Sequence, residues 1–200
     1  MSVILHLLKW RLGLAPAEVW TTEAERACLA RHAAGKHRLA EIGVWHGGTT
    51  RVLRAAMAPD AVLYAIDPYE KGRLGFSAPR IIGRAEVGRV RGGRVVWIRA
   101  TGHDAAGSAE IRAVAPFDFV FIDAAQTEEL LHAEWTAWAP LIAPGGLMAL
   151  HDSRFVPEHG IGEQTSVRYT REHILPDPAF EVVDAVESLT VLRRRSRPVT

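Results

Sequence analysis

Five short apolar runs, separated for the most part by helical patterns, constrain the fold of this chain more than any other feature. Each run is rich in β-branched or aromatic residues, as is typical of buried strands. Strands that alternate with helices pair in parallel, and the helices cover both faces of the sheet. The runs are RLAEIGV (38–44), AVLYAID (61–67), RVVWIRA (94–100), FDFVFID (117–123) and GLMALHD (146–152).

The end of the chain departs from this alternation. The runs FEVVDAV (180–186) and SLTVLRRR (188–195) have too few residues between them for a crossover helix, so they must form an antiparallel hairpin. The expected fold class is α/β, a Rossmann-like three-layer sandwich around a seven-stranded, mostly parallel sheet. We expect one domain, residues 1–200, with N-terminal helices (1–36), a cofactor-binding core (38–152), a substrate lid (153–178) and the terminal hairpin (179–195).

Charge and cysteine content exclude several classes of protein. The 24 basic and 23 acidic residues nearly cancel, so no global field attracts nucleic acid or an anionic membrane. The single cysteine, Cys28, rules out an intrachain disulfide and a multi-cysteine zinc site, and we expect it to pack in the core. We therefore expect a cytoplasmic protein without nucleic-acid or membrane partners, and we leave open whether it forms a homo-oligomer.

The N-terminal segment is expected to form two helices. Lys9 and Arg11 interrupt its apolar opening, which favours an amphipathic helix over a signal peptide. Thr22 stands three residues before Glu25, and this spacing predicts a capping box at the start of a second helix.

The residues after each strand are the candidates for ligand binding, because ligands of open parallel sheets lie outside the carboxyl ends of the strands. The first strand ends in EIGVWHGG, where Glu41 is followed by Gly43, Gly47 and Gly48, and a helix is expected to begin near Thr49. Glycine lets backbone N–H groups approach a ligand, and the helix adds its dipole. The spacing differs from the G-x-G-x-x-G of pyrophosphate-binding loops. Glu41 suits an ammonium group, such as that of S-adenosylmethionine, better than a diphosphate.

The second and third strands also end in polar residues. Asp67 stands where an acidic side chain accepts both hydroxyls of a ribose, and a helix cap before Pro68 is the structural alternative. The loop RATGHDAAG (99–107) places Thr101, His103 and Asp104 within reach of an adenine, and we leave open which of them contacts the ring.

Two carboxylates, Asp123 and Asp152, end the fourth and fifth strands, and His151 precedes the second of them. Carboxylates brought to one edge of a sheet repel each other unless a cation lies between them. A divalent metal with oxygen ligands, or the substrate itself, would remove this repulsion. Helix caps and loop hydrogen bonds are the structural alternative.

In their order and spacing, LAEIGVWHGGTT, YAIDPYE, FDFVFIDAAQTEE and LIAPGGLMALHDS resemble the class I S-adenosylmethionine-dependent methyltransferases. The resemblance covers residues 38–152. It is to small-molecule O-methyltransferases that include macrolide-sugar and cephalosporin-biosynthesis enzymes and are related to the catechol type. It implies a sheet with one reversed strand at its edge, and S-adenosylmethionine as the cofactor. The implied cofactor contacts are Glu41, Gly43, Gly47, Gly48, Thr49, Asp67, Thr101, His103 and Asp123.

The same resemblance implies a metal. It assigns Asp123 and Asp152 as ligands of Mg²⁺, with His151 as a third ligand, and Mg²⁺ would anchor and acidify a substrate hydroxyl. His151 and Asp123 are the catalytic candidates. Relatives often read F-I-D-G-D-H where this chain reads F-I-D-A-A-Q, so Ala125 and Gln126 replace a carboxylate and a histidine. Without Mg²⁺, a histidine must act as the base, and His151 is favoured over His103 and His159 by its position.

The expected function is the transfer of a methyl group to a hydroxyl of a small molecule, such as a sugar or natural product. A nicotinamide-dependent oxidoreductase would explain Gly43 and Asp67, but neither the glycine spacing nor the hairpin. A methyltransferase-fold protein without transfer activity would explain Ala125 and Gln126. In the predicted lid, the residues that we expect to face substrate are His159, Gln164 and Arg168; an ordinary surface connection is the alternative.

Overall fold

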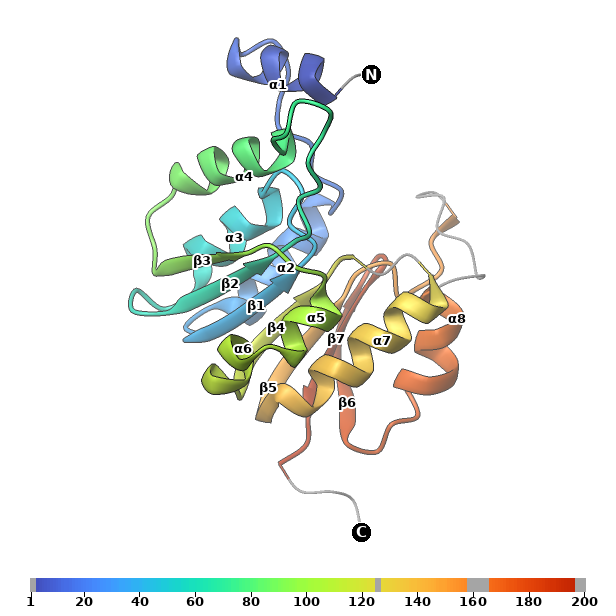
Figure 1. Ribbon diagram of the computed structural model, residues 1–200. Coiled ribbons are helices and arrows are strands. Elements are labelled where there is room, and N and C mark those ends of the chain that lie inside the picture. Colours follow the sequence, from blue (N-terminus) through green and yellow to red (C-terminus); the bar gives the residue numbers. More distant parts are fainter. Residues whose placement is uncertain (1–2, 125–126, 158–165, 197–200) are drawn as a thin grey trace.

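The computed structural model describes residues 3–124, 127–157 and 166–196, and a seven-stranded sheet forms its centre (Figure 1). The strand order is β3-β2-β1-β4-β5-β7-β6. The strands are β1 (Arg38–Ile42), β2 (Val62–Ile66), β3 (Arg94–Ile98), β4 (Phe117–Ile122), β5 (Ile142–Leu150), β6 (Phe180–Val186) and β7 (Leu189–Arg194). Every predicted strand is present, so the prediction of an α/β fold around a mostly parallel sheet is confirmed.

Strands β1 to β5 pair in parallel, whereas β7 runs antiparallel to both β5 and β6. The predicted terminal hairpin is therefore confirmed. The expectation of a reversed strand at the edge of the sheet is wrong, because β7 lies between β5 and β6 and leaves the edge to β6. The strand order changes direction between β1 and β4, which is where an open sheet binds its ligand.

Helices cover both faces of the sheet. One buried cluster joins the sheet to α2 and α3 through residues such as Leu29, Leu53 and Phe121. The other joins it to α5, α6 and α7 through residues such as Ile111 and Trp135. The helices are α1 (Val3–Arg11), α2 (Glu23–Ala33), α3 (Gly48–Ala56), α4 (Ala78–Gly88), α5 (Gly102–Gly107), α6 (Ala109–Val114), α7 (Glu128–Trp138) and α8 (Ser166–Tyr169), with a 3₁₀ turn at Ala139–Leu141 and a π-helical turn at Thr170–Ile174.

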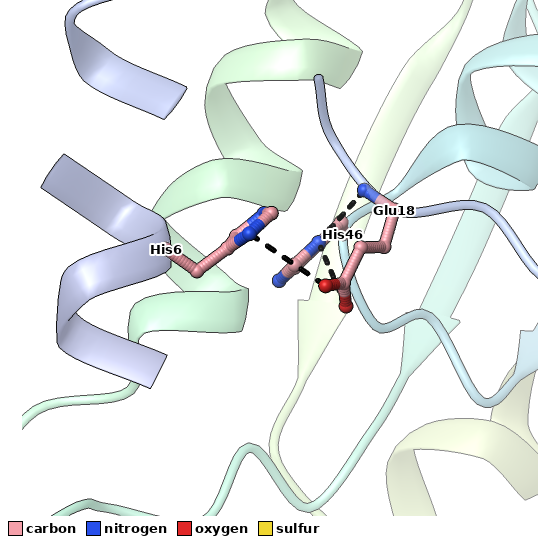
Figure 2. A group of neighbouring side chains, drawn as sticks. All are labelled: His6, Glu18 and His46. Atoms are coloured by element: carbon pink, nitrogen blue, oxygen red, sulfur yellow. Dashed lines mark hydrogen bonds and ion pairs between the residues drawn. The ribbon is translucent and has the colours of Figure 1, made fainter. Parts of the chain in front are cut away.

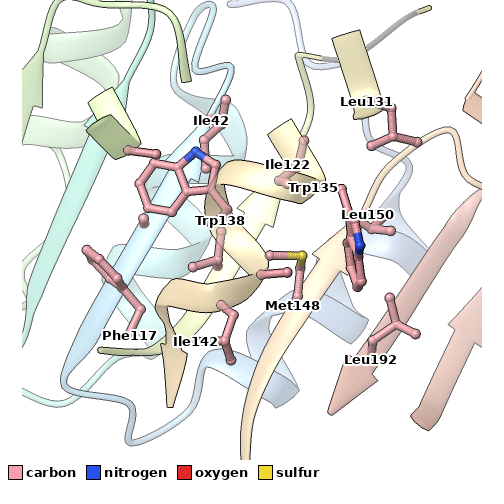
Figure 3. Packing of buried hydrophobic residues seen from close by; sticks show 14 of the residues in the cluster. Ile42, Phe117, Ile122, Leu131, Trp135, Trp138, Ile142, Met148, Leu150 and Leu192 are labelled. Carbon is pink, nitrogen blue, oxygen red and sulfur yellow. The ribbon is translucent and has the colours of Figure 1, made fainter. Parts of the chain in front are cut away.

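Large aromatic side chains anchor the cluster under α5, α6 and α7 (Figure 3). Trp138 is fully buried, its ring centroid lies 5.6 Å from that of Phe117, and its indole N–H donates to the Gly102 carbonyl at 3.1 Å. Burial of each such side chain stabilises the fold by about 3 kcal/mol. Because Met148 and Leu192 belong to the same cluster, this packing fixes β4, β5 and β7 relative to one another.

Both predicted N-terminal helices are present. The Thr22 hydroxyl accepts the Glu25 backbone N–H, and the Glu25 carboxylate accepts the Thr22 N–H, so the predicted capping box is confirmed. Cys28 is buried on α2, as expected. Helix α1 packs on α4, where the Trp10 indole donates to Glu86. Among the residues that the structure describes, no helix has the length and apolar character needed to cross a membrane.

Candidate active site

A cavity of about 640 Å³ lies at the carboxyl ends of β1, β2, β4 and β5, next to the point where the strand order reverses. We call it the main cavity. The predicted site residues that form its wall are Glu41, Gly43, Gly48, Thr49, Asp67, Asp123, His151 and Asp152. The fold therefore brings most of the predicted site together in one place.

The main cavity is strongly acidic. The described residues of its wall include no Lys or Arg, and His151 is the basic side chain among them. A cavity of this charge favours a cationic ligand and disfavours a phosphate. The carboxylates in the wall are Glu18, Glu25, Glu41, Asp67, Asp123 and Asp152.

The glycines of the turn after β1 serve the packing of the backbone. Gly43 and Gly47 have φ angles of 88° and 72°, in the left-handed region that favours glycine. A Cβ atom on Gly43 would lie 2.7 Å from the carbonyl oxygen of Asp123, so glycine lets β1 pass close to the end of β4. A Cβ on Gly47 would lie 3.0 Å from the backbone of α4. This close packing places the N-terminus of α3, with Gly48 and Thr49, in the wall of the main cavity.

Glu41 is fully buried at the end of β1. Neither of its carboxylate oxygens has a hydrogen-bond partner among the described residues. Burial raises the pKa of Glu41 well above its usual value. The Thr50 hydroxyl is near enough to oppose this shift but forms no hydrogen bond with Glu41, and the charges of Asp123 and Asp67 add to the shift. A buried carboxylate without a partner is costly. Since Glu41 lies in the wall of the main cavity, its position suits a cationic group of a ligand.

Asp67 holds the turn after β1 in place. Its Oδ2 accepts the backbone N–H groups of Val44 at 3.0 Å and Trp45 at 3.1 Å, and its Oδ1 accepts that of Tyr69 at 2.7 Å. A carboxylate has about four acceptor positions, so these bonds leave room for a ligand hydroxyl on the cavity side. The structural alternative for Asp67, a helix cap before Pro68, is not realised, because the next helix, α4, begins at Ala78 and is capped by Ser77.

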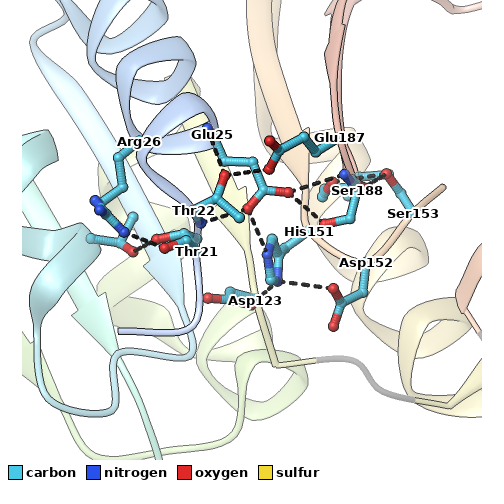
Figure 4. Close-up of polar contacts among 12 residues, drawn as sticks. Thr21, Thr22, Glu25, Arg26, Asp123, His151, Asp152, Ser153, Glu187 and Ser188 are labelled. Carbon is cyan, nitrogen blue, oxygen red and sulfur yellow. Dashed lines mark hydrogen bonds and ion pairs between the residues drawn. The ribbon is translucent and has the colours of Figure 1, made fainter. Parts of the chain in front are cut away.

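His151 lies at the centre of a network of carboxylates (Figure 4). Its Nε2 lies 3.2 Å from Oε2 of Glu25, and its Nδ1 lies 2.7 Å from Oδ1 of Asp123 and 3.3 Å from Oδ1 of Asp152. Burial opposes protonation of the ring, but the contacts with Asp123 and Glu25 outweigh it and raise the pKa of His151 to about 10. Both ring nitrogens face carboxylates, so neither is free to take a proton from a substrate.

Glu25 is the member of this network that sequence reasoning assigned to a helix cap alone. Its Oε1 accepts the Ser188 N–H at 3.1 Å and the Ser188 hydroxyl at 2.6 Å, while its Oε2 accepts the Thr22 N–H. Burial raises the pKa of Glu25, but the hydrogen bonds from His151, Ser188 and Thr22 outweigh it and hold the pKa at about 2. One carboxylate thus joins α2, the end of β5 and the β6–β7 turn. The sequence identifies Glu25 only through the capping box, which does not predict its contact with His151.

Thr101 and His103 do not belong to the described wall of the main cavity. The Thr101 hydroxyl accepts the Asp104 N–H at 3.1 Å and caps α5, while the His103 side chain is exposed beside Glu134. The geometry therefore does not support the predicted contact of either residue with an adenine.

The predicted lid residues are only partly described. Arg168 of α8 forms a hydrogen bond with Glu128 at the start of α7, with 3.2 Å between Nε and Oε2, so it ties these two helices together. His159 and Gln164 lie outside the described residues, as do Ala125 and Gln126.

Trp45 and His46 connect the turn after β1 to the N-terminal segment. Trp45 lies in the wall of the main cavity, and its indole N–H donates to Glu18 at 3.1 Å. His46 is buried; its Nδ1 accepts the Glu18 N–H at 3.0 Å, and its ring stacks on that of His6 with centroids 5.0 Å apart (Figure 2). Burial lowers the pKa of His46 to about 4, so this ring is neutral at neutral pH.

A second cavity, of about 410 Å³, adjoins the main cavity and shares Trp45, Asp67 and Pro68 with it. The remainder of its wall comes from α1 and from residues 69–79, with Tyr69 and Phe76 among its apolar members. This arrangement suits a ligand with a cationic part in the main cavity and an apolar part beside it.

A protein-family model described as a methyltransferase domain matches residues 40–153. The match spans Glu41 through Asp152 and therefore includes every predicted site residue of the main cavity. No curated protein matches the sequence.

Solved structures share the fold. Cofactor-bound Rv0187 from MTB superposes with a TM-score of 0.71 at 16% identity, with 98% of this chain and 91% of that chain covered. The O-methyltransferase TomG from Streptomyces achromogenes, in complex with SAM, gives 0.64 at 17% identity, over 98% and 90% of the chains. The methyltransferase MycE of the mycinamycin biosynthetic pathway, in complex with Mg and SAH, gives 0.59 at 18% identity, over 96% and 54%. These similarities confirm the predicted class I methyltransferase fold.

Proposed function

Because the chain belongs to the methyltransferase-domain family, we propose that it transfers a methyl group from S-adenosylmethionine to a hydroxyl of a small molecule. The related fold of TomG is that of an O-methyltransferase, and MycE has been solved with mycinamycin VI. These likenesses support a hydroxylated natural product or sugar as the acceptor. We further propose that residues 1–200 are one methyltransferase domain, and we place it in the cytoplasm.

The main support for this proposal is the acidic wall of the main cavity. S-adenosylmethionine brings a sulfonium and an ammonium group and no phosphate, whereas a nicotinamide dinucleotide brings a negatively charged diphosphate. The described wall offers several carboxylates and no Lys or Arg. Since like charges are costly in a partly buried site, the cavity favours the sulfonium cofactor over the dinucleotide.

Each part of the cofactor has a counterpart in the wall. Glu41, which is buried and has no hydrogen-bond partner among the described residues, would receive the ammonium group. Asp67 would accept the ribose hydroxyls with its remaining acceptor positions. The backbone at Gly48 and Thr49, at the N-terminus of α3, would bind the carboxylate of the amino-acid part.

The reaction is an in-line displacement at the methyl carbon. The acceptor oxygen forms a bond to the methyl carbon, the carbon–sulfur bond breaks with its electron pair moving to sulfur, and the hydroxyl proton must go to a base. We assign Asp123 as that base, because its carboxylate lies in the wall of the main cavity. His151 then acts as a positioning residue, since it is held by Glu25 and lies against Asp123 and Asp152. The prediction that His151 is the base is replaced by this assignment.

The wall also offers donors for Mg²⁺. Asp123 and Asp152 face the same cavity, and carboxylate oxygens are ligands that Mg²⁺ prefers. When bound there, Mg²⁺ would anchor the acceptor hydroxyl and lower its pKa. His151 does not fit the predicted role of a third ligand, because both of its ring nitrogens face carboxylates.

A transfer assay tests the proposal. Purified protein would be incubated with methyl-labelled S-adenosylmethionine and a panel of catechols, phenols and sugars, with and without Mg²⁺. We expect label in at least one hydroxylated acceptor and none with Asp123→Ala. The matched control is Asp60→Ala, an exposed aspartate outside the main cavity, which should transfer as the wild type does. Binding of the cofactor without transfer to any acceptor would favour a methyltransferase-fold protein that does not transfer methyl groups.

A further inference from the structure

Three side chains with different metal-binding atoms converge at the edge of the sheet, between α2 and β6. Cys28 and His32 stand four residues apart on α2 and so share one face of the helix, and Asp184 comes from β6. Oδ2 of Asp184 lies 2.8 Å from Nε2 of His32 and 3.5 Å from Sγ of Cys28. The three atoms all lie within 4.8 Å of one another.

A register shift in β6 directs Asp184 toward α2. The pairing of β6 with β7 shifts between Val182 and Asp184, so that Asp184 pairs with Val191. Paired residues of an antiparallel ladder point to the same face of the sheet. Val191 belongs to the buried cluster that also contains Cys28, so Asp184 faces α2. Such bulges re-aim side chains and are enriched next to functional sites.

The distances approach those of a tetrahedral metal site. Zinc binds sulfur at about 2.3 Å and nitrogen or oxygen at about 2.1 Å, which sets about 3.6 Å between sulfur and oxygen ligands and about 3.4 Å between nitrogen and oxygen. The observed 3.5 Å between Cys28 and Asp184 already agrees. The 2.8 Å between His32 and Asp184 would need to open by roughly 0.6 Å, within the reach of side-chain rotation.

The site is also accessible. The side chains of His32 and Asp184 are 18% and 24% exposed, whereas Cys28 is buried. An ion would therefore enter from the side of His32 and Asp184, where a water can take the fourth position. Arg31 competes with a metal ion for Asp184, because its guanidinium lies 2.6 Å from Oδ2 of that residue. Because the Arg31 side chain is 60% exposed, it can turn into solvent when a metal replaces its charge.

We infer that Cys28, His32 and Asp184 form a binding site for a divalent transition-metal ion of the zinc type, separate from the main cavity. Binding replaces the Cys28 thiol proton, which is released to solvent, and the thiolate, the imidazole and the carboxylate bind the ion. Burial and the charge of Asp184 raise the pKa of the Cys28 thiol to about 11, so the thiol keeps its proton when no metal is present. A bound ion would tie α2, which carries Glu25, to the edge of the sheet.

A second group of possible donors, His6, Glu18 and His46, fits a metal less well (Figure 2). Nδ1 of His46 accepts the Glu18 N–H, so the proton of this neutral ring lies on Nε2, and neither nitrogen offers a lone pair. The His6 and His46 rings also stack with 10° between their planes, whereas a metal must lie in the plane of each ring that binds it. This group therefore serves as a control.

Spectroscopic titration with Co²⁺, followed by competition with Zn²⁺, tests the inference on untagged protein. We expect one equivalent of Co²⁺ with a thiolate-to-cobalt charge-transfer band, which Zn²⁺ abolishes. Cys28→Ser should remove the band, and His32→Gln and Asp184→Asn should weaken binding at least about 100-fold. Arg31→Gln should tighten binding, because it removes the competing cation. His46→Gln should bind as the wild type does.

Several outcomes would overturn the inference. One is the absence of a charge-transfer band in the wild type, which needs no variant and so does not depend on whether a variant folds. Another is stoichiometric binding that persists in Cys28→Ser but is lost in His46→Gln, since this would place the ion at the other group. Weaker binding in Arg31→Gln would also count against it. None of these results depends on methyl transfer.

Discussion

The buried carboxylate of Glu41 allows the sharpest prediction, because its replacement should raise the free energy of unfolding and lower the affinity for the cofactor. Glu41→Gln keeps the shape of the side chain and removes its charge. A buried polar group without a partner costs about 1–3 kcal/mol, and a charged one costs more. The glutamine amide is still a buried polar group, so the gain comes from removing the charge alone. We expect the free energy of unfolding of the ligand-free variant to exceed that of the wild type by up to about 1.4 kcal/mol for each pH unit above 4.5, until the folded-state pKa is reached.

The pH dependence of this gain has a definite sign. The pKa of Glu41 is raised in the folded state above the ordinary value of 4.5. The folded protein therefore binds more protons than the unfolded chain above pH 4.5, and this contribution to stability is lost as the pH rises toward the folded-state pKa. Glutamine does not titrate. The advantage of Glu41→Gln should thus grow with pH above 4.5, as measured by urea unfolding at several pH values.

Binding should respond in the opposite direction. If Glu41 receives the ammonium group, Glu41→Gln should weaken S-adenosylhomocysteine binding about 30-fold or more, the equivalent of about 2 kcal/mol, as measured by calorimetry. Glu134→Gln is the matched control: Glu134 is buried in α7, its Oε2 has no partner among the described residues, and burial raises its pKa to about 7. It should also stabilise the fold, by up to about 3 kcal/mol above pH 7, without changing affinity. A Glu41→Gln variant that binds as the wild type does, or that is less stable than it, would refute this reasoning.

Three further predictions address the turn, the base and the N-terminal segment. Gly43→Ala should lower the free energy of unfolding by about 3 kcal/mol, because it combines a positive φ with a Cβ 2.7 Å from the Asp123 carbonyl; an equally stable variant in denaturant titration would contradict this. Asp123→Ala should abolish turnover yet leave S-adenosylhomocysteine affinity within a few-fold, and a wild-type enzyme whose rate is unaffected by EDTA would exclude the Mg²⁺ site. The pKa of His46 is lowered from 6.5 to about 4, so stability should fall as the pH drops through this range, and His46→Gln should remove up to about 3 kcal/mol of that loss; parallel pH profiles for the two proteins would show that His46 is not the cause.

Features that depend on neighbouring residues could be predicted from the sequence. The capping box of α2 needs only Thr22 and Glu25, and the strands follow from local runs of apolar residues. The main cavity was also predictable, since the carboxyl ends of parallel strands meet at one edge whatever lies between them. Glu41, Asp67 and Asp123 lie there for that reason.

Features that depend on contacts between distant elements could not be predicted in the same way. No pattern in the sequence links Glu25 to His151, which meet because α2 packs over the end of β5. The contact with Glu25 also holds Nε2 of His151, the residue whose position in the sequence favoured it as the base. Thr101 shows the converse: it follows a strand as a ligand contact would, but its hydroxyl is used to cap α5. The place of β7 inside the sheet likewise depends on how the hairpin docks on β5.

Equilibrium binding of two cofactors, measured separately, tests the central claim most directly. Titration of the purified chain with S-adenosylhomocysteine and, separately, with NAD asks whether the acidic main cavity selects a sulfonium-type cofactor over a diphosphate. The account predicts saturable binding of S-adenosylhomocysteine that Glu41→Gln and Asp67→Asn both weaken, and no binding of NAD at the same concentrations. Binding of NAD without binding of S-adenosylhomocysteine would contradict it.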